Sequence, residues 1–380
     1  MLKTACQHCS QTLEFPEEMA GREITCPSCG RSTRLDAPEP ARIRIPKAAP
    51  SIFAAKTRQP GSSPVAPIAN RLLESIESVL IGKRREITLL LAAYFAEGHV
   101  LLEDVPGVAK TMLARALAQS VGCSFKRLQC TPDLLPSDIT GASIFNLKTA
   151  EFEFRPGPLF AQTLLADEIN RATPRAQSAL LEAMAERQVT ADGVNYELRR
   201  PFFLIATQNP IDHEGTFPLP EAQLDRFLVR LSLGYPGLDE ENRMLERLQL
   251  KHPIDAVQQV ATPEEILAAQ DAVRAVHVDP RVREYVAKVV RATREHESVR
   301  LGGSPRASLA LFRAAQALAA IQGFDFVLPD DVKEIAPFVL AHRLVLRPES
   351  RLRKATATAV IDQILGQVPV PTLAAADQGR

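Results

Sequence analysis

Apolar and polar positions divide the middle of the chain into short strands separated by helices. Five short segments, most of them apolar, are predicted to be strands: residues 99–103, 125–129, 164–166, 201–207 and 228–233. Apolar residues at helical spacing predict helices at 70–80 and 112–121, and Thr173-Pro174 marks the start of a third helix. This alternation of strands and helices indicates an α/β fold.

The pattern changes towards the C-terminus. Four segments are rich in Ala, Leu and Val at helical spacing, with Pro at or near each start: residues 263–278, 280–297, 304–322 and 329–346. Two segments inside the α/β region, 141–154 and 189–198, alternate as β-hairpins do. The second contains Asp192-Gly193, which is the strongest short hairpin signal. We therefore expect an α/β unit with two inserted hairpins, followed by a helical unit.

Composition and charge limit the class of protein. The chain has 380 residues, 46% of them hydrophobic, and its 45 basic residues balance 45 acidic ones. This is enough material for two packed units and a small module, and the neutrality argues against a protein built mainly to coat nucleic acid. No apolar run reaches about 18 residues, so we expect no membrane-spanning segment.

The segment from Asp104 to Thr111 suggests a phosphate-binding loop. It joins the strand at 99–103 to the helix at 112–121, and its small residues are followed by Lys110-Thr111. In such a loop the backbone N–H groups and the helix N-terminus face phosphates, the lysine reaches the β- and γ-oxygens, and the threonine ligates Mg²⁺. The alternative is an ordinary strand–turn–helix.

Two residues depart from the strict pattern G-x-x-x-x-G-K-[ST]. Asp104 stands in place of the first Gly, and Ala109 stands directly before the lysine. Asp104 is compatible with bound phosphate only if its side chain points away from the nucleotide. Ala109 is compatible with the loop if its backbone is already right-handed helical at the start of the helix.

Asp167 and Glu168 follow directly on the apolar segment 164–166. Paired carboxylates at the end of such a strand suit a metal–phosphate site, in which Asp167 holds Mg²⁺ and Glu168 orients or deprotonates a water. Alone, the pair could equally be a solvated acidic turn. Its position about 60 residues after the phosphate loop, on a second buried strand, favours the metal site.

Three further polar residues could complete the site. Asn209 follows the strand at 201–207, where an amide can hold the attacking water. Arg306 lies in the first turn of a helix that has Ser304 as its N-cap and Pro305 at its first position. Arg226 precedes the strand at 228–233. Taken singly, each arginine is more often a solvated surface residue.

Taken together, these motifs resemble those of AAA+ ATPases, and specifically the MoxR family, over about residues 70–348. The resemblance implies an α/β fold with a P-loop core, a parallel sheet between helices, and an all-helical lid after it. It implies that Lys110 and Thr111 are Walker A, Asp167 and Glu168 Walker B, Asn209 sensor 1, Arg306 sensor 2, and Arg226 an arginine finger offered to a neighbouring subunit.

The resemblance also implies a set of nucleotide contacts. Ile81 and Gly82 would lie near adenine, together with Val79, although a helix C-cap at Gly82 fits these residues equally well. The full set is Ile81, Gly82, Asp104, Val105, Pro106, Gly107, Val108, Ala109, Lys110, Thr111, Met112, Asp167 and Arg306.

The two hairpins resemble the helix-2 insert and the pre-sensor hairpin of the AAA+ branch that includes MoxR and magnesium-chelatase ATPases. In such rings, these loops project towards the pore or a client protein. The alternative is that both are structural surface hairpins, and the two interpretations are compatible.

The N-terminal region contains two C-x₂-C pairs, Cys6/Cys9 and Cys26/Cys29, with sixteen residues between them. Pairs at this spacing are a strong zinc signal, because four thiolates can close a tetrahedral site. A segment of about 35 residues cannot bury a sufficient core alone, so the metal would supply its folding energy. Disulfides are the alternative, and a chain with no signal peptide disfavours them. Cys123 and Cys130 are expected to be plain interior or half-buried residues.

These signals predict five parts: a zinc ribbon at 1–36, a Pro-rich basic linker at 37–67, the ATPase core at 68–236, the lid with a C-terminal helix at 237–366, and a disordered tail at 367–380. We expect a cytoplasmic protein that forms a ring, most simply a hexamer, and uses ATP, Mg²⁺ and structural Zn²⁺.

Two classes of function compete. The MoxR resemblance implies a chaperone-like ATPase that remodels, activates or loads metal into protein clients with von Willebrand factor A domains. Alternatively, the zinc ribbon and the basic linker bind DNA or RNA and the motor acts there. A nucleotide-gated scaffold is a third, non-enzymatic possibility.

Overall fold

A computed structural model describes residues 2–6, 8–9, 12–15, 23–34, 63–210, 215–248 and 253–371. The chain divides into two compact units, Met1–Ser51 and Ile52–Arg380, which are described separately. Residues 37–62 of the predicted linker and the predicted tail from 372 onward lie outside the described residues. The last three residues of the predicted linker, 65–67, belong to a helix.

The first unit consists of two antiparallel hairpins. Its strands are β1 Leu2–Ala5, β2 Thr12–Phe15, β3 Glu23–Thr25 and β4 Ser32–Arg34, with β1 paired to β2 and β3 paired to β4.

A five-stranded parallel sheet lies at the centre of the second unit, in the order β13–β5–β12–β9–β6. Its strands are β5 Val100–Glu103, β6 Phe125–Gln129, β9 Thr163–Asp167, β12 Phe203–Gln208 and β13 Val229–Leu231. All five predicted strands are therefore confirmed: the strand at 125–129 has the predicted ends, and the ends of the other four differ by at most two residues.

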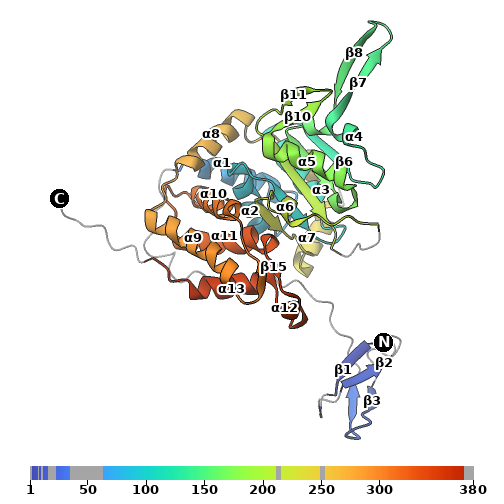
Figure 1. Ribbon diagram of the computed structural model, residues 1–380, viewed down its shortest axis with the longest axis vertical. Coiled ribbons are helices and arrows are strands. Elements are labelled where there is room, and N and C mark those ends of the chain that lie inside the picture. The colour runs from blue at the N-terminus through green and yellow to red at the C-terminus, as the bar shows by residue number, and fades with distance from the viewer. Residues whose placement is uncertain are drawn as a thin grey trace, which may run out of the picture. The chain divides into compact units, whose positions relative to one another are not determined.

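Helices cover both faces of this sheet (Figure 1). Adjacent strand residues point to opposite faces: Leu165 of β9 packs in one apolar cluster with Leu72 and Leu113, whereas Leu164 packs in a second cluster with Leu180. The helices behind the first cluster are α1 Val65–Glu77, α2 Arg84–Phe95 and α3 Lys110–Val121, and those behind the second are α4 Pro136–Thr140 and α5 Pro174–Glu186. The predicted three-layer αβα core is confirmed.

Two helix boundaries differ from the sequence-based expectation. The helix predicted at 70–80 is α1, which begins at Val65 and ends at Glu77 with Ser78 as its C-cap. The suggestion that Gly82 is a helix C-cap is therefore wrong. Helix α3 begins at Lys110, two residues earlier than predicted, because the phosphate-loop geometry starts the helix at the lysine.

Both predicted hairpins are present. The first pairs β7 Gly141–Asn146 with β8 Glu151–Pro156 and projects from the body of the unit in Figure 1. The second pairs β10 Gln188–Ala191 with β11 Val194–Glu197 around Asp192-Gly193, both of which have positive φ. The short helices of the core are 3₁₀ helices Pro158–Phe160 and Ile169–Arg171 and helix α6 Glu221–Leu224.

The C-terminal part forms a helical lid. Its helices are α7 Leu238–Leu248, α8 Pro263–Ala275, α9 Pro280–Glu295, α10 Pro305–Ile321, α11 Pro329–Leu340, α12 Pro348–Leu352 and α13 Ala357–Gln367, with 3₁₀ helices at Pro253–Ala256 and Ala341–Arg343. A short antiparallel pair, β14 Val299–Leu301 with β15 Val345–Leu346, accompanies them. The helix predicted at 329–346 thus stops at Leu340.

The lid and the core share their largest apolar cluster. Leu311 and Ala315 of α10 belong to the same buried cluster as Leu90 of α2, and the two helices lie side by side in Figure 1. Among the described helices, none combines the length and the apolar character needed to cross a membrane.

Candidate functional site

A pocket of about 470 Å³ opens at the carboxyl ends of strands β5, β9 and β12. Ligands of open α/β sheets bind at this edge. The pocket is lined by Pro106, Gly107, Ala109, Lys110, Thr111, Met112, Arg127, Gln129, Asp167, Glu168 and Asn209. The structure therefore brings together residues from the predicted phosphate loop, the acid pair and the Asn209 strand.

Lys110 is the first residue of α3 and faces this pocket. Its Nζ donates to the backbone carbonyl of Asp104 over 2.8 Å. Half-burial lowers the pKa of Lys110, while the carboxylates of Asp104, Asp167 and Glu168 act in the opposite direction. A lysine ammonium beside a helix N-terminus is suited to bind an anion.

Ala109 does not have the right-handed helical backbone that was expected. It is the N-cap of α3 with φ +62° and ψ +26°, in the left-handed region. Gly107 also has positive φ, +84°. Positive φ of this kind is what lets successive backbone N–H groups form an anion-binding turn, and a Cβ at residue 109 makes it cost roughly 1–2 kcal/mol. Ala109 therefore fits the loop under strain.

The side chain of Asp104 points away from the phosphate loop, as its compatibility with phosphate requires. Its Oδ2 accepts hydrogen bonds from the backbone N–H of Leu233 and Gly234, over 2.5 and 2.8 Å, and from the hydroxyl of Ser232 over 3.2 Å. Its Oδ1 accepts from the N–H of Val105. The carboxylate thus holds the segment that leads from β13 towards α7. Asp104 as a whole residue is only 6% exposed.

Thr207 of β12 holds both members of the acid pair. Its buried hydroxyl donates to Oδ1 of Asp167 over 2.6 Å and accepts from the backbone N–H of Glu168 over 2.8 Å. Glu168 has φ +57°, which turns the chain sharply after β9. Asp167 and Glu168 therefore present separate carboxylates to the pocket.

Sequence reasoning missed three residues that contact these carboxylates. Arg127 donates from Nε and a terminal nitrogen to Oδ2 of Asp167, over 3.0 and 2.6 Å. Gln129 and Arg171 donate to Oε2 of Glu168 over 2.8 and 3.1 Å. The available signal was the polar spacing Arg127-x-Gln129, but it identifies the site only once β6 is known to lie beside β9.

The remaining predicted residues lie in different places. Asn209 is 7% exposed and lines the pocket. Arg226 is half-buried and donates to the carbonyl of Leu181 over 3.0 Å. Arg306 is exposed in the first turn of α10. Six predicted nucleotide contacts do not line the pocket within the part of the chain that the structure describes: Ile81, Gly82, Asp104, Val105, Val108 and Arg306. Arg226, predicted to act in a neighbouring subunit, does not line it either.

The four N-terminal cysteines converge in the first unit, where their sulfur atoms all lie within 4.8 Å of one another. Two of the separations are 3.8 Å, between Cys6 and Cys29, and 3.7 Å, between Cys9 and Cys26. Four thiolates at about 2.3 Å from a central Zn²⁺ would lie about 3.8 Å apart. All four are free thiols, and Cys123 and Cys130 are half-buried and buried as expected.

Comparisons with known proteins agree with this geometry. The family described as ATPase family associated with various cellular activities (AAA) matches residues 99–229, and the AAA lid domain matches residues 291–364. The chain is 52% identical to the uncharacterised protein YeaC of Bacillus subtilis, over 80% of this chain and 95% of YeaC. It is 41% identical to chaperone MoxR1 of Mycobacterium tuberculosis, over 81% of this chain and 84% of MoxR1. A crystal structure of a presumed ATPase from Cytophaga hutchinsonii matches with TM-score 0.76 and 36% identity, covering 81% and 97% of the two chains.

Proposed function

The chain belongs to the MoxR family of AAA+ ATPases, and on this premise we propose that it binds and hydrolyses ATP in order to remodel a protein client. The observation that carries the proposal is the pocket in which Lys110, Thr111, Asp167, Glu168 and Asn209 meet. These residue types are the ones that phosphoryl transfer requires: an anion cradle, oxygen ligands for a metal, and groups that orient a water.

The residues present fit Mg²⁺. Asp167 offers a carboxylate that already pairs with the guanidinium of Arg127 on the pocket side, and Thr111 offers a hydroxyl at the helix start. Both are hard oxygen donors of the kind that Mg²⁺ prefers. When bound there, the ion would neutralise charge on the phosphate oxygens.

Each side chain then has a distinct role in the proposed reaction. Lys110 and the loop N–H groups hold the phosphates against the N-terminus of α3. Glu168 orients the attacking water and accepts its proton, and Asn209 fixes the same water from the neighbouring strand β12. Thr207 keeps the two carboxylates apart, so that one serves the metal and the other serves the water.

We propose that the site is completed by a second copy of the chain in a ring, most simply a hexamer. Arg226 lies outside the pocket of its own subunit, which is consistent with a finger offered to the neighbouring site. Arg306 would contact the nucleotide of its own subunit as the lid moves. An arginine supplied in this way stabilises the negative charge that develops during transfer.

The hairpin β7–β8 is a candidate contact for a client protein. Its apolar side chains are unusually exposed: Ile144 45%, Phe145 47%, Leu147 88% and Phe152 74%. Phe145 and Phe152 stack edge to face at 5.3 Å. Exposed apolar clusters mark interaction sites. We propose clients with von Willebrand factor A domains, as the family resemblance suggests.

We also propose that the four cysteines of the first unit hold structural Zn²⁺ and that this ribbon docks a protein. We propose a cytoplasmic location, because thiol ligands stay reduced there and the protein would need ATP.

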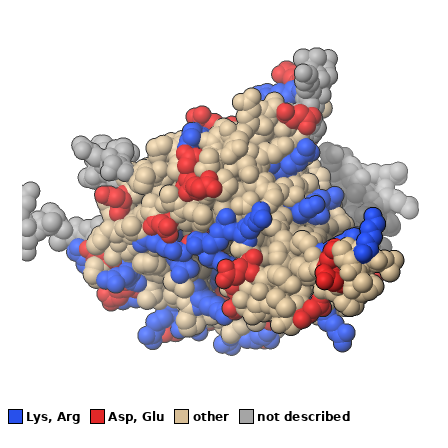
Figure 2. All heavy atoms as spheres, turned by 90° about the horizontal axis from the view of Figure 1, so that it is seen from above, with Lys and Arg blue, Asp and Glu red and all other residues tan. Residues whose placement is uncertain are grey.

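Nucleic acid is the second candidate partner, and one observation favours it. On the face shown in Figure 2, Lys and Arg side chains gather in a central band, although Asp and Glu lie on both sides of it. A nucleic-acid partner would stimulate hydrolysis, and its binding constant would fall steeply with salt. A scaffold that binds nucleotide without hydrolysing it is the remaining alternative.

The test of the proposed function is the Glu168→Gln variant. It should bind ATP as tightly as the unaltered protein and hydrolyse it at least about a hundredfold more slowly, because the group that activates water is lost. Lys110→Ala should lose binding instead. Normal turnover by Glu168→Gln would exclude the mechanism, and hydrolysis absent from the unaltered protein would favour the scaffold. The same variant, locked with ATP, would capture clients.

A further inference from the structure

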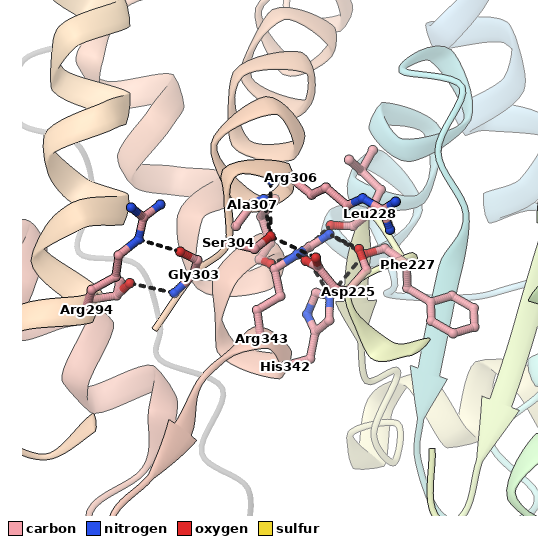
Figure 3. A network of polar contacts seen from close by, with 12 residues as sticks. Asp225, Phe227, Leu228, Arg294, Gly303, Ser304, Arg306, Ala307, His342 and Arg343 are labelled. Atoms are coloured by element: carbon pink, nitrogen blue, oxygen red, sulfur yellow. Dashed lines mark hydrogen bonds and ion pairs between the residues drawn. The ribbon is translucent and has the colours of Figure 1, made fainter. Parts of the chain in front are cut away.

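Arg343 is a buried cation, and most of its hydrogen bonds go to the segment that carries Arg226; one more goes to the carbonyl of Val339 in α11. It ends the 3₁₀ helix Ala341–Arg343, and its side chain is 3% exposed. The guanidinium donates to Oδ1 of Asp225 over 2.8 Å. It also donates to the backbone carbonyls of Asp225, Phe227 and Leu228, over 3.1, 2.6 and 3.1 Å. The chain is therefore held on both sides of Arg226 (Figure 3).

Asp225 connects this cluster to α10. Its second oxygen, Oδ2, accepts a hydrogen bond from the hydroxyl of Ser304 over 2.8 Å. The same hydroxyl is the N-cap of α10 and accepts from the backbone N–H of Arg306 over 3.1 Å and of Ala307 over 3.4 Å. Both partners of the carboxylate thus come from the lid, whereas Arg226 belongs to the core (Figure 3).

His342 does not add a second positive charge to this buried cluster. Its Nε2 lies 2.9 Å from a terminal nitrogen of Arg343 and 3.0 Å from the carbonyl oxygen of Phe227. Burial, and then the adjacent Arg343, hold the pKa of His342 well below its usual range. The ring is therefore neutral, and Asp225 balances the charge of Arg343.

A buried guanidinium has lost the water that hydrates its charge, and this loss costs free energy. An apolar side chain could pack the lid against the core without that cost. What the guanidinium offers is a rigid planar fork of donors that fixes the direction of its acceptors. Four of those acceptors lie in residues 225–228. We infer that Arg343 is a positioning residue, which sets the direction of Arg226 and, through Asp225 and Ser304, ties that direction to the helix that carries Arg306.

This inference rests on the proposed function, in which Arg226 acts in the neighbouring site and Arg306 responds to nucleotide in its own. Movement of α10 at one site then changes the position of the finger at the next site. Ser304, Asp225 and Arg343 form the connection between the two sites.

The test uses mixed assemblies. Arg343→Lys keeps the charge and loses the fork, so the assembly of that variant alone should bind ATP normally and show kcat lowered by about tenfold to a hundredfold. Lys110→Ala subunits have a defective site but an intact finger. Mixing them with Arg343→Lys subunits should restore turnover, because each intact site next to a Lys110→Ala subunit receives a well-placed finger.

A parallel mixture of Arg226→Ala with Lys110→Ala separates the two ideas. Rescue in this mixture without rescue of Arg343→Lys would overturn the inference and leave the proposed function standing. If neither mixture recovers, the finger assignment fails and the inference fails with it. Rescue of both supports both.

Ser304→Asp provides a second test at a half-buried position, should Arg343 variants fail to fold. Asp retains the N-cap but replaces the donor to Asp225 with a repelling carboxylate. The Hill coefficient of hydrolysis against ATP should fall to about 1. Ser308→Asp, one turn further along α10, adds the same charge and should keep the cooperativity of the unaltered protein. Equal behaviour of the two variants would contradict the connection through Ser304.

Discussion

The hydroxyl of Thr207 donates to Asp167 over 2.6 Å and is completely buried between the two strands that carry the candidate catalytic residues. The same oxygen accepts from the N–H of Glu168. One side chain on β12 therefore holds both the carboxylate of Asp167, the proposed metal ligand at the end of β9, and the backbone of Glu168, the proposed general base that follows it. Nothing about a threonine within an apolar strand distinguishes this role in the sequence.

Thr207→Val should lower kcat by at least about tenfold and destabilise the fold by about 1–3 kcal/mol. Oδ1 of Asp167 and the N–H of Glu168 would each lose the hydrogen bond to Thr207, and Val has nearly the same shape as Thr. Steady-state ATP hydrolysis and urea unfolding measure the two effects. Thr207→Ser keeps the hydroxyl and serves as the control. A Val variant with full activity would show that the hydroxyl is not needed.

Ala109→Gly should stabilise the protein by about 0.5–1 kcal/mol. Gly adopts positive φ without strain, which outweighs its greater entropy in the unfolded chain. Thermal unfolding followed by circular dichroism checks the result. The matched control is Ala268→Gly, at an exposed position inside α8, where glycine should cost up to about 1 kcal/mol. A loss of stability in both variants would mean that residue 109 carries no strain.

Asp104→Gly would bring the loop closer to the usual phosphate-loop pattern, yet we expect it to destabilise the protein by at least about 2 kcal/mol. The N–H groups of Leu233 and Gly234 would lose their acceptor. Asp104→Asn keeps one acceptor oxygen and should lose less. Chemical denaturation of the three proteins orders them. Equal stability of the Gly variant and the unaltered protein would show that the contact contributes nothing.

Stability should fall as the pH drops from about 6.5 towards 4, in part because of His99. Burial lowers the pKa of His99 to about 4 in the folded protein, where Nδ1 accepts from the N–H of Leu204. The unfolded chain therefore binds the proton more readily in this range, and the contribution lost reaches roughly 3 kcal/mol. Unfolding free energies at pH 7.5 and 5 measure the slope.

The variant pair for this experiment is His99→Gln and His277→Gln. The first should flatten the slope, because the buried titrating group is removed. The second removes an exposed histidine and should leave the slope as it is. An unchanged slope in His99→Gln would assign the acid sensitivity to other groups.

The purified protein should contain one zinc ion per chain, and Cys26→Ser should remove it. A zinc-selective chelator should make residues 1–34 sensitive to protease, since the metal supplies the folding energy of a unit this small. Metal analysis and limited proteolysis are the measurements. Cys123→Ser lies outside the cluster and should keep the zinc. Retention of zinc by Cys26→Ser would place the ion elsewhere.

The parts of the fold that local sequence determines were predictable. The strands β5, β9 and β12 are short apolar runs bounded by polar residues, and the two hairpins show alternation, the second with Asp192-Gly193 as its turn signal. The acid pair stands at the end of β9, and Lys110 and Thr111 begin the helix after the loop that follows β5, so their convergence follows from the geometry of a parallel sheet.

The contacts between distant segments were not predictable in the same way. Arg127 and Gln129 reach the acid pair only because β6 pairs with β9 in the register Gln129 to Asp167. Arg343 reaches Asp225 across 118 positions of sequence. The left-handed backbone of Ala109 was also not predictable, because alanine disfavours positive φ. The loop imposes this conformation in spite of the residue type.

The apolar cluster shared by α10 and α2 has a consequence for how the molecule moves. Swinging the lid open as a rigid flap would expose Leu311 and Leu90 to water, at a cost of about 25 cal/mol for each square ångström of apolar surface. Shear between packed helices keeps that surface covered, with displacements of roughly 1–2 Å. The lid is therefore expected to slide over the core during a reaction cycle, and small displacements of α10 are large enough to change the hydrogen bonds at its N-terminus.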